Sequence, residues 1–142
     1  MASEEIRRYS SLVTSTAQQR PLAAVDWEHW RPTDQATLLF VIDEERILLI
    51  RKKRGLGAGK INGPGGRLEP GESAHDCALR ELQEELRIRA WSADWRGNHR
   101  FQFIDGYRLD VDVFVTDGFD GEPTETDEAI PLWFPVSEIP SD

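Results

Sequence analysis

The chain has 142 residues, an apolar content of 39% and a charged content of 30%, which are typical of a single globular domain. It contains no run near the roughly 20 apolar residues that a membrane-spanning helix needs, and its polar N-terminus does not resemble a signal peptide. A formal net charge of −9 argues against a nucleic-acid polymer as partner, because such polymers require clustered positive charge. With Cys77 as its one cysteine, we expect a cytoplasmic protein without disulfides or a membrane partner.

The first 34 residues predict a helix followed by an irregular arm. Apolar and aromatic residues recur at helical spacing over residues 3–17, and two glutamates lie in the first turn. Residues 18–34 contain two prolines and two tryptophans, so we expect an arm that is packed by its tryptophans. The remaining residues, 35–142, are expected to form one globular unit.

Two strands and a glycine-rich loop are predicted next. Ala36–Ile42 and Arg46–Arg51 are apolar, β-branched runs that three acidic residues separate, which is typical of two strands with a tight connection. Gly55–Gly66 contains six glycines and one proline and is expected to be a loop.

The strongest helix prediction covers Ser73–Leu86. Ser73 and Asp76 have the spacing of a capping box, and Pro70 with Gly71 prevents an earlier start. Leu79, Leu82 and Leu86 form an apolar stripe that we expect to face the core.

The C-terminal half predicts a hairpin and a last strand. The hairpin consists of Phe101–Ile104, a turn at Asp105-Gly106, and Tyr107–Thr116, whose apolar residues alternate. Asp117–Glu128 is expected to be an acidic loop, and Leu132–Val136 a short strand. Mixed strands around one central helix indicate an α+β or α/β fold.

Three carboxylates are predicted to share one face of the central helix. On a helical wheel, Glu84 and Glu85 fall within roughly 60° of Glu81. A solvated acidic face is the simpler interpretation, because like charges at this spacing repel by only tenths of a kcal/mol. Convergent carboxylates are, however, the ligands that hard divalent cations prefer.

The loop before this helix favours the metal interpretation. Gly66, five residues, Glu72, seven residues, and then Arg80-Glu81-Leu82-Gln83-Glu84-Glu85 match the Nudix box, G-x5-E-x7-R-E-U-x-E-E-x-G-U, where U is apolar. Ile88 matches the last apolar position, and Arg87 stands where the box has glycine. The chain therefore resembles the Nudix hydrolases, and this resemblance implies a mixed β-sheet sandwiched between helices.

The resemblance also implies a metal site. Its ligands would be the Gly65 carbonyl and the carboxylates of Glu81, Glu84, Glu85 and Glu128, and its metal Mg²⁺, with Mn²⁺ as an alternative. Glu72 and Arg80 would complete the catalytic set. Arg80 would orient the Glu84 carboxylate, although a simple i,i+4 surface pair is the alternative. The general base and the number of metal ions remain open.

Beyond the box, the chain is similar to MutT-like oxidised purine nucleoside triphosphatases. This similarity implies cleavage of substrates such as 8-oxo-dGTP to a nucleoside monophosphate and pyrophosphate, which sanitises the nucleotide pool and supports DNA repair. The implied substrate-binding residues are Thr37, Lys52, Asn62, Gly65, Gly66, Arg67 and Phe101. For Asn62 a plain turn residue is the alternative.

Two other function classes are open at this stage. The first is a Nudix pyrophosphatase for nucleotide sugars or ADP-ribose, and the second is a Nudix-fold nucleotide-binding regulator without turnover. Relatives continue past the equivalent of Pro140 with a tryptophan and paired aspartates that contact the base, whereas this sequence ends at Asp142. We expect base selectivity to come from other residues unless the chain is a truncated form. The intact box carboxylates disfavour the regulator.

Overall fold

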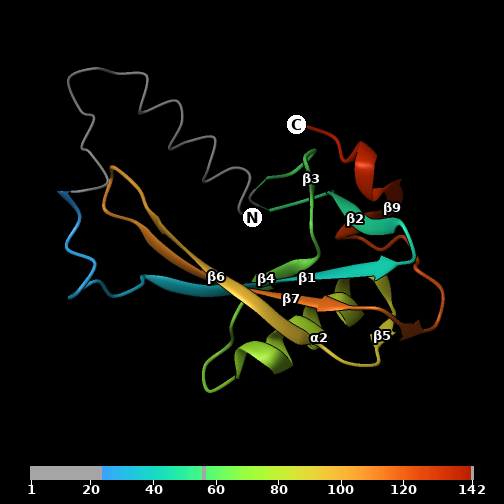
Figure 1. The fold of residues 1–142 in the computed structure, drawn as a ribbon, viewed down its shortest axis with the longest axis horizontal. Coiled ribbons are helices and arrows are strands. Elements are labelled where there is room, and N and C mark those ends of the chain that lie inside the picture. Colours follow the sequence, from blue (N-terminus) through green and yellow to red (C-terminus); the bar gives the residue numbers. More distant parts are fainter. Residues whose placement is uncertain (1–23, 56, 142) are drawn as a thin grey trace.

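A seven-stranded mixed β-sheet forms the centre of the computed structural model, which describes residues 24–55 and 57–141 (Figure 1). The helix predicted over residues 3–17 falls outside the described residues. Within the described residues, no helix is long and apolar enough to cross a membrane. The α+β class expected from the sequence is confirmed, with a mixed sheet and one α-helix among the described elements.

The strands pair in the order β3-β2-β1-β7-β6, while β4 pairs with β1 and β9 pairs with β2. Only β1 and β7 run parallel, and the other pairs of this sheet are antiparallel. A separate two-stranded sheet joins β5 and β8. The strands are β1 (Asp34–Asp43), β2 (Arg46–Lys52), β3 (Ile61–Asn62), β4 (Gly65–Arg67), β5 (Arg89–Ala90), β6 (Asp94–Gln102), β7 (Arg108–Thr116), β8 (Phe119–Asp120) and β9 (Ala129–Pro135).

The central helix α2 (Ala74–Leu86) begins where the sequence predicts it. The Ser73 hydroxyl accepts a hydrogen bond from the Asp76 N–H at 3.1 Å, which satisfies one of the free amides of the first turn. Leu82 and Leu86 are fully buried against the sheet, whereas Leu79 is only partly buried. The helix covers one face of the sheet (Figure 1). The first core cluster, which includes Leu39, Leu48 and Leu82, packs between the helix and the sheet.

Arg87 ends the helix in a left-handed conformation, with φ of 61°. Its N–H donates to the Gln83 carbonyl at 2.9 Å, as in a helix C-terminal cap. Glycine is the usual residue for this conformation, which explains why the Nudix box has glycine here. Arg87 therefore takes the left-handed conformation at the glycine position of the box, and the helix ends at Leu86.

The prediction that Gly55–Gly66 is entirely loop was wrong. It contains β3 and the start of β4, and Gly65 pairs with Leu38 of β1. This pairing is close, because a Cβ on Gly65 would collide with the Thr37 carbonyl oxygen. Glycines that suggest a loop here instead allow a strand to approach β1 closely.

The strand bounds in the C-terminal half also differ from the prediction. β6 begins at Asp94, seven residues before the predicted Phe101, because most of its side chains are exposed and give no apolar alternation. The predicted acidic loop contains the two-residue strand β8, and β9 begins at Ala129. The hairpin between β6 and β7 is present as expected.

A second apolar cluster involves the β6–β7 hairpin and β1. Its buried members are Ala36, Phe103, Leu109 and Val111, and Phe101 packs against them. Since Leu39 and Val41 of β1 belong to the first core, neighbouring β1 residues contribute to two different clusters.

Candidate active site

Three carboxylates from two elements converge beside the glycine-rich strand β4. Glu81 and Glu84 come from α2, and Glu128 precedes β9; one oxygen of each lies within 4.8 Å of the others. We call these three residues the carboxylate cluster. Their side chains are 14%, 46% and 35% exposed, respectively. Three negative charges therefore lie close together at a partly desolvated place, beside the guanidinium groups of Arg80 and Arg54.

The neighbouring Glu85 is almost completely buried, with 3% of its surface exposed. Burial raises its pKa to about 8, although the Gly65 N–H donates a hydrogen bond to its Oε1 at 2.9 Å. Burial also raises the pKa of Glu81. A solvated acidic face is therefore the wrong interpretation of this helix, because Glu85 is buried and only 14% of the Glu81 side chain is exposed.

Arg80 connects the carboxylates to one another. Its guanidinium donates two hydrogen bonds to Glu72, at 2.7 and 2.9 Å, and Nη1 donates to Glu81 at 2.9 Å and to Glu84 at 3.2 Å. A further bond of 3.2 Å reaches the Arg67 carbonyl. The hydrogen bonds and charge of Arg80 lower the pKa of Glu72 to about 2. Arg80 thus holds three carboxylates in place through hydrogen bonds, and its contact with Glu84 is not an isolated surface ion pair.

Gly66 leaves room for the Glu81 carboxylate. A Cβ at this position would lie 2.5 Å from the Glu81 Cδ, which is closer than two non-bonded carbon atoms approach in proteins. The absence of a side chain serves a different purpose at each of the two adjacent glycines. At Gly65 it allows β4 to pair with β1, and at Gly66 it leaves space for the Glu81 carboxylate.

Glu128 is positioned by a turn that is anchored to the helix. The Thr126 hydroxyl donates to the Glu85 carbonyl at 2.7 Å and accepts from the Glu128 N–H at 3.2 Å. The Lys53 N–H donates to the Glu128 carbonyl at 2.9 Å. The role of Thr126 in holding this turn was not predicted from the sequence.

A cavity of about 420 Å³, which we call the carboxylate cavity, is lined by both acidic and basic side chains. Its carboxylate donors are hard oxygen ligands of the kind that Mg²⁺ or Mn²⁺ accepts, and its basic residues can receive phosphate oxygens. The donor set therefore fits a divalent cation together with a polyanion. The lining residues are Lys52, Arg54, Gly55, Gly65, Gly66, Arg67, Glu69, Arg80, Glu81, Glu85 and Glu128.

Three residues expected to bind substrate do not line this cavity. Thr37 is fully buried, and its hydroxyl lies 3.4 Å from the Cys77 sulfur, so the structure does not place it on a cavity wall. The Asn62 side chain accepts the Gly63 N–H at 2.8 Å, as a turn residue does. Phe101 packs in the second apolar cluster. The expected Lys52, Gly65, Gly66 and Arg67 do line the cavity, as does Arg54, which sequence reasoning missed.

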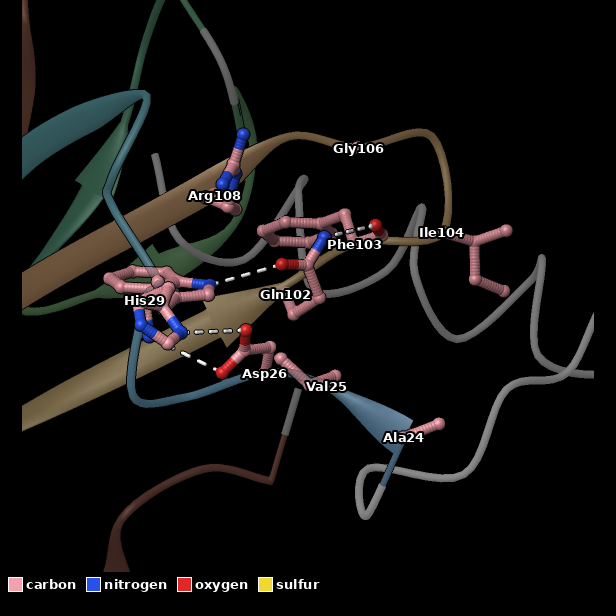
Figure 2. Close-up of a pocket in the computed structure, with 10 residues that line it drawn as sticks. Ala24, Val25, Asp26, His29, Gln102, Phe103, Ile104, Gly106 and Arg108 are labelled. Atoms are coloured by element: carbon pink, nitrogen blue, oxygen red, sulfur yellow. Dashed lines mark hydrogen bonds and ion pairs between the residues drawn. The ribbon is translucent and has the colours of Figure 1, made fainter.

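A second cavity of about 460 Å³, the arm cavity, lies between residues 24–30 and the tip of the β6–β7 hairpin (Figure 2). Four of its polar side chains form two pairs. His29 Nδ1 lies 2.9 Å from Asp26, and the Trp30 indole donates to Gln102 at 3.0 Å. Figure 2 shows Gln102 also turned toward the Phe103 carbonyl, to which it donates at 3.0 Å. Within the part of the chain that the structure describes, the arm cavity therefore contains one carboxylate, which is already paired with His29.

Comparisons with known proteins point to one family. The family model described as "NUDIX domain" matches residues 32–142. The oxidized purine nucleoside triphosphate hydrolase of Danio rerio is 45% identical over 105 residues, which are 73% of this chain and 67% of the relative; that of Mus musculus is 42% identical with the same coverage. A crystal structure of a MutT NUDIX hydrolase from Burkholderia pseudomallei superposes with a TM-score of 0.70 at 27% identity, covering 80% of this chain and 90% of the other.

Proposed function

This chain belongs to the Nudix family and is a Nudix hydrolase, and from that premise we propose that it hydrolyses oxidised purine nucleoside triphosphates. The leading candidate substrate is 8-oxo-dGTP, cleaved to the nucleoside monophosphate and pyrophosphate. Two relatives at 45% and 42% identity that carry the name oxidized purine nucleoside triphosphate hydrolase support this substrate class. We place the activity in the cytoplasm, as part of nucleotide-pool sanitisation.

One observation carries the proposal: Glu81, Glu85 and Glu128 line one cavity together with basic side chains, and Glu84 lies beside Glu81 and Glu128. A nucleoside triphosphate is a polyanion that travels with a divalent cation, so its recognition needs both signs of charge. Lys52, Arg54 and Arg67 supply the positive side and the cluster supplies the metal side.

The protein residues have distinct roles in this proposal. Glu81, Glu84, Glu85 and Glu128, with the Gly65 carbonyl, hold the cation, which is Mg²⁺ or alternatively Mn²⁺. When bound, the cation activates water and neutralises the charge on the phosphates. Arg80 keeps the carboxylates in place and is itself held by Glu72 through two hydrogen bonds. Lys52 and Arg67 bind phosphate oxygens.

The buried position of Glu85 supports a role beyond structure. A carboxyl group with a pKa of about 8 is poorly stabilised as an anion by its own surroundings, and a nearby divalent cation would restore the ionised form. Natural chains rarely bury an ionisable group in this way unless it has a partner.

A nucleotide panel tests the proposed function. Purified protein is incubated with Mg²⁺ and with 8-oxo-dGTP, dGTP, ADP-ribose or a nucleotide sugar, and monophosphate, pyrophosphate and phosphate are quantified. We expect the highest kcat/KM for the oxidised triphosphate, with pyrophosphate as product. Preference for ADP-ribose or the nucleotide sugar would move the chain to another Nudix substrate class, and absence of turnover on every compound would favour a nucleotide-binding regulator.

A further inference from the structure

Arg54 forms an ion pair with a member of the carboxylate cluster. Its Nη2 lies 3.1 Å from Glu128 Oε1, so the pair joins the residues after β2 to those before β9. Arg54 also lines the carboxylate cavity next to Lys52 and Gly55. A guanidinium thus already contacts a carboxylate that the proposed function assigns to a metal ion.

The turn that carries Glu128 does not depend on this ion pair. Backbone and side-chain bonds from Lys53 and Thr126 hold the turn, and Lys53 also pairs with Glu125. Arg54 is 64% exposed, and exposed ion pairs contribute only about 0–1 kcal/mol to stability. The Arg54 side chain can therefore leave Glu128 without disturbing the fold.

We propose that Arg54 competes with the divalent cation for Glu128 and, once displaced, binds a phosphate group of the substrate. This inference rests on the proposed function and adds a coupling between metal and nucleotide. The Arg54 guanidinium and the divalent cation both need the Glu128 carboxylate, so each weakens the binding of the other. A substrate phosphate in the carboxylate cavity would give the displaced guanidinium a second anionic partner. Arginine suits this exchange because its planar fork matches carboxylate and phosphate alike.

The two halves of the proposal predict opposite effects for one substitution. Without Arg54, Glu128 loses a competing cation, so Mn²⁺ should bind about 2–5-fold more tightly in the absence of nucleotide, as expected for a pair at the surface. The same variant lacks the phosphate contact, so it should bind nucleotide about 10-fold more weakly at saturating Mn²⁺, as for one lost charge-assisted hydrogen bond.

The test measures two dissociation constants for wild type, Arg54→Ala and Arg51→Ala. The probes are Mn²⁺ alone, followed by electron paramagnetic resonance, and a non-hydrolysable purine triphosphate at saturating Mn²⁺, followed by calorimetry. Arg51→Ala is the matched control, because it removes the same charge from a side chain that bonds the Gly59 carbonyl. We expect tighter Mn²⁺ and weaker nucleotide binding for Arg54→Ala only.

Either constant can overturn the proposal. Mn²⁺ affinity of Arg54→Ala equal to or weaker than that of Arg51→Ala would exclude competition for Glu128. An unchanged nucleotide affinity would exclude transfer to phosphate. Both measurements are made without turnover, so they are separate from the nucleotide panel, whose failure would reject the proposed hydrolysis and leave these constants meaningful.

Discussion

The carboxylate cavity and the arm cavity are similar in volume, about 420 and 460 Å³, but their polar groups are satisfied differently. In the arm cavity, Asp26 pairs with His29 and Gln102 pairs with Trp30. In the carboxylate cavity, burial raises the pKa of Glu81 and Glu85, and negative groups face one another. Volume therefore does not separate the two cavities, whereas, among the described residues, buried carboxyl groups of raised pKa and carboxylates that converge on one point are found only in the carboxylate cavity.

The largest expected effect follows from removing one charge of the carboxylate cluster. Glu84→Gln keeps side-chain shape but weakens metal binding, so kcat should fall on the order of 10²-fold or more, about 3 kcal/mol. The thermal midpoint should change little, because the repulsion that is relieved and the exposed ion pair with Arg80 that is lost are both small. Steady-state kinetics and thermal unfolding measure both quantities. Glu125→Gln, a carboxylate paired with Lys53, is the control and should keep its activity.

The interaction between Glu72 and Arg80, which holds the carboxylate cluster in place, can be tested by varying pH. Arg80 holds the pKa of Glu72 at about 2, so the ionised form is favoured in the folded protein. The resulting stability is present above the ordinary pKa of 4.5 and is lost as pH falls toward 2. We therefore expect Glu72→Gln to lower the free energy of unfolding by about 2 kcal/mol at pH 7.

The difference between Glu72→Gln and wild type should shrink between pH 4.5 and pH 2, as urea unfolding at several pH values would reveal. Glu69→Gln is the control, since Glu69 is 63% exposed and lies 3.7 Å from Arg80. A constant difference across this range would contradict the assigned partnership.

The two glycines of β4 provide the next comparison. In Gly66→Ala the new methyl meets the end of the flexible Glu81 side chain, so the protein should fold while kcat falls about 10-fold, or ~1.4 kcal/mol. In Gly65→Ala the methyl meets the Thr37 backbone, so stability should suffer first. Thermal midpoints and kcat of both variants would separate these effects. Full activity of Gly66→Ala would show that Glu81 need not hold its position.

The smallest effect on activity is expected at the arm cavity. Gln102→Ala removes the acceptor of the Trp30 indole, which is buried, so stability should fall by about 1–2 kcal/mol. kcat should be unchanged, because the arm cavity takes no part in hydrolysis in this account. A large loss of kcat at an unchanged thermal midpoint would erase the distinction between the two cavities.

Local signals explain what the sequence could predict. The cap at Ser73 and the period of α2 define a helix by contacts within four residues, so its bounds were correct. The Nudix box spacing likewise led to Glu72, Arg80 and the helix glutamates, which the structure brings together. Such information is contained in neighbouring residues.

Long-range contacts explain what was missed. The start of β6 has exposed side chains and becomes a strand only because β7 pairs with it. β4 was mistaken for a loop because glycines give no strand pattern, and its pairing depends on β1. The ion pair between Arg54 and Glu128 joins residues 74 positions apart, and no spacing rule indicates it. The burial of Thr37 against Cys77 has the same origin.

The central claim is that the carboxylate cluster binds a divalent cation, and the thermal midpoint as a function of Mg²⁺ concentration tests it most directly. A ligand at about 100 times its dissociation constant stabilises the folded state by roughly 2.7 kcal/mol. Wild type and the control Glu125→Gln should therefore show a midpoint that rises with Mg²⁺, whereas Glu81→Gln should lose most of that rise. An equal rise in all three proteins, or no rise in wild type, would contradict the assignment of the metal site.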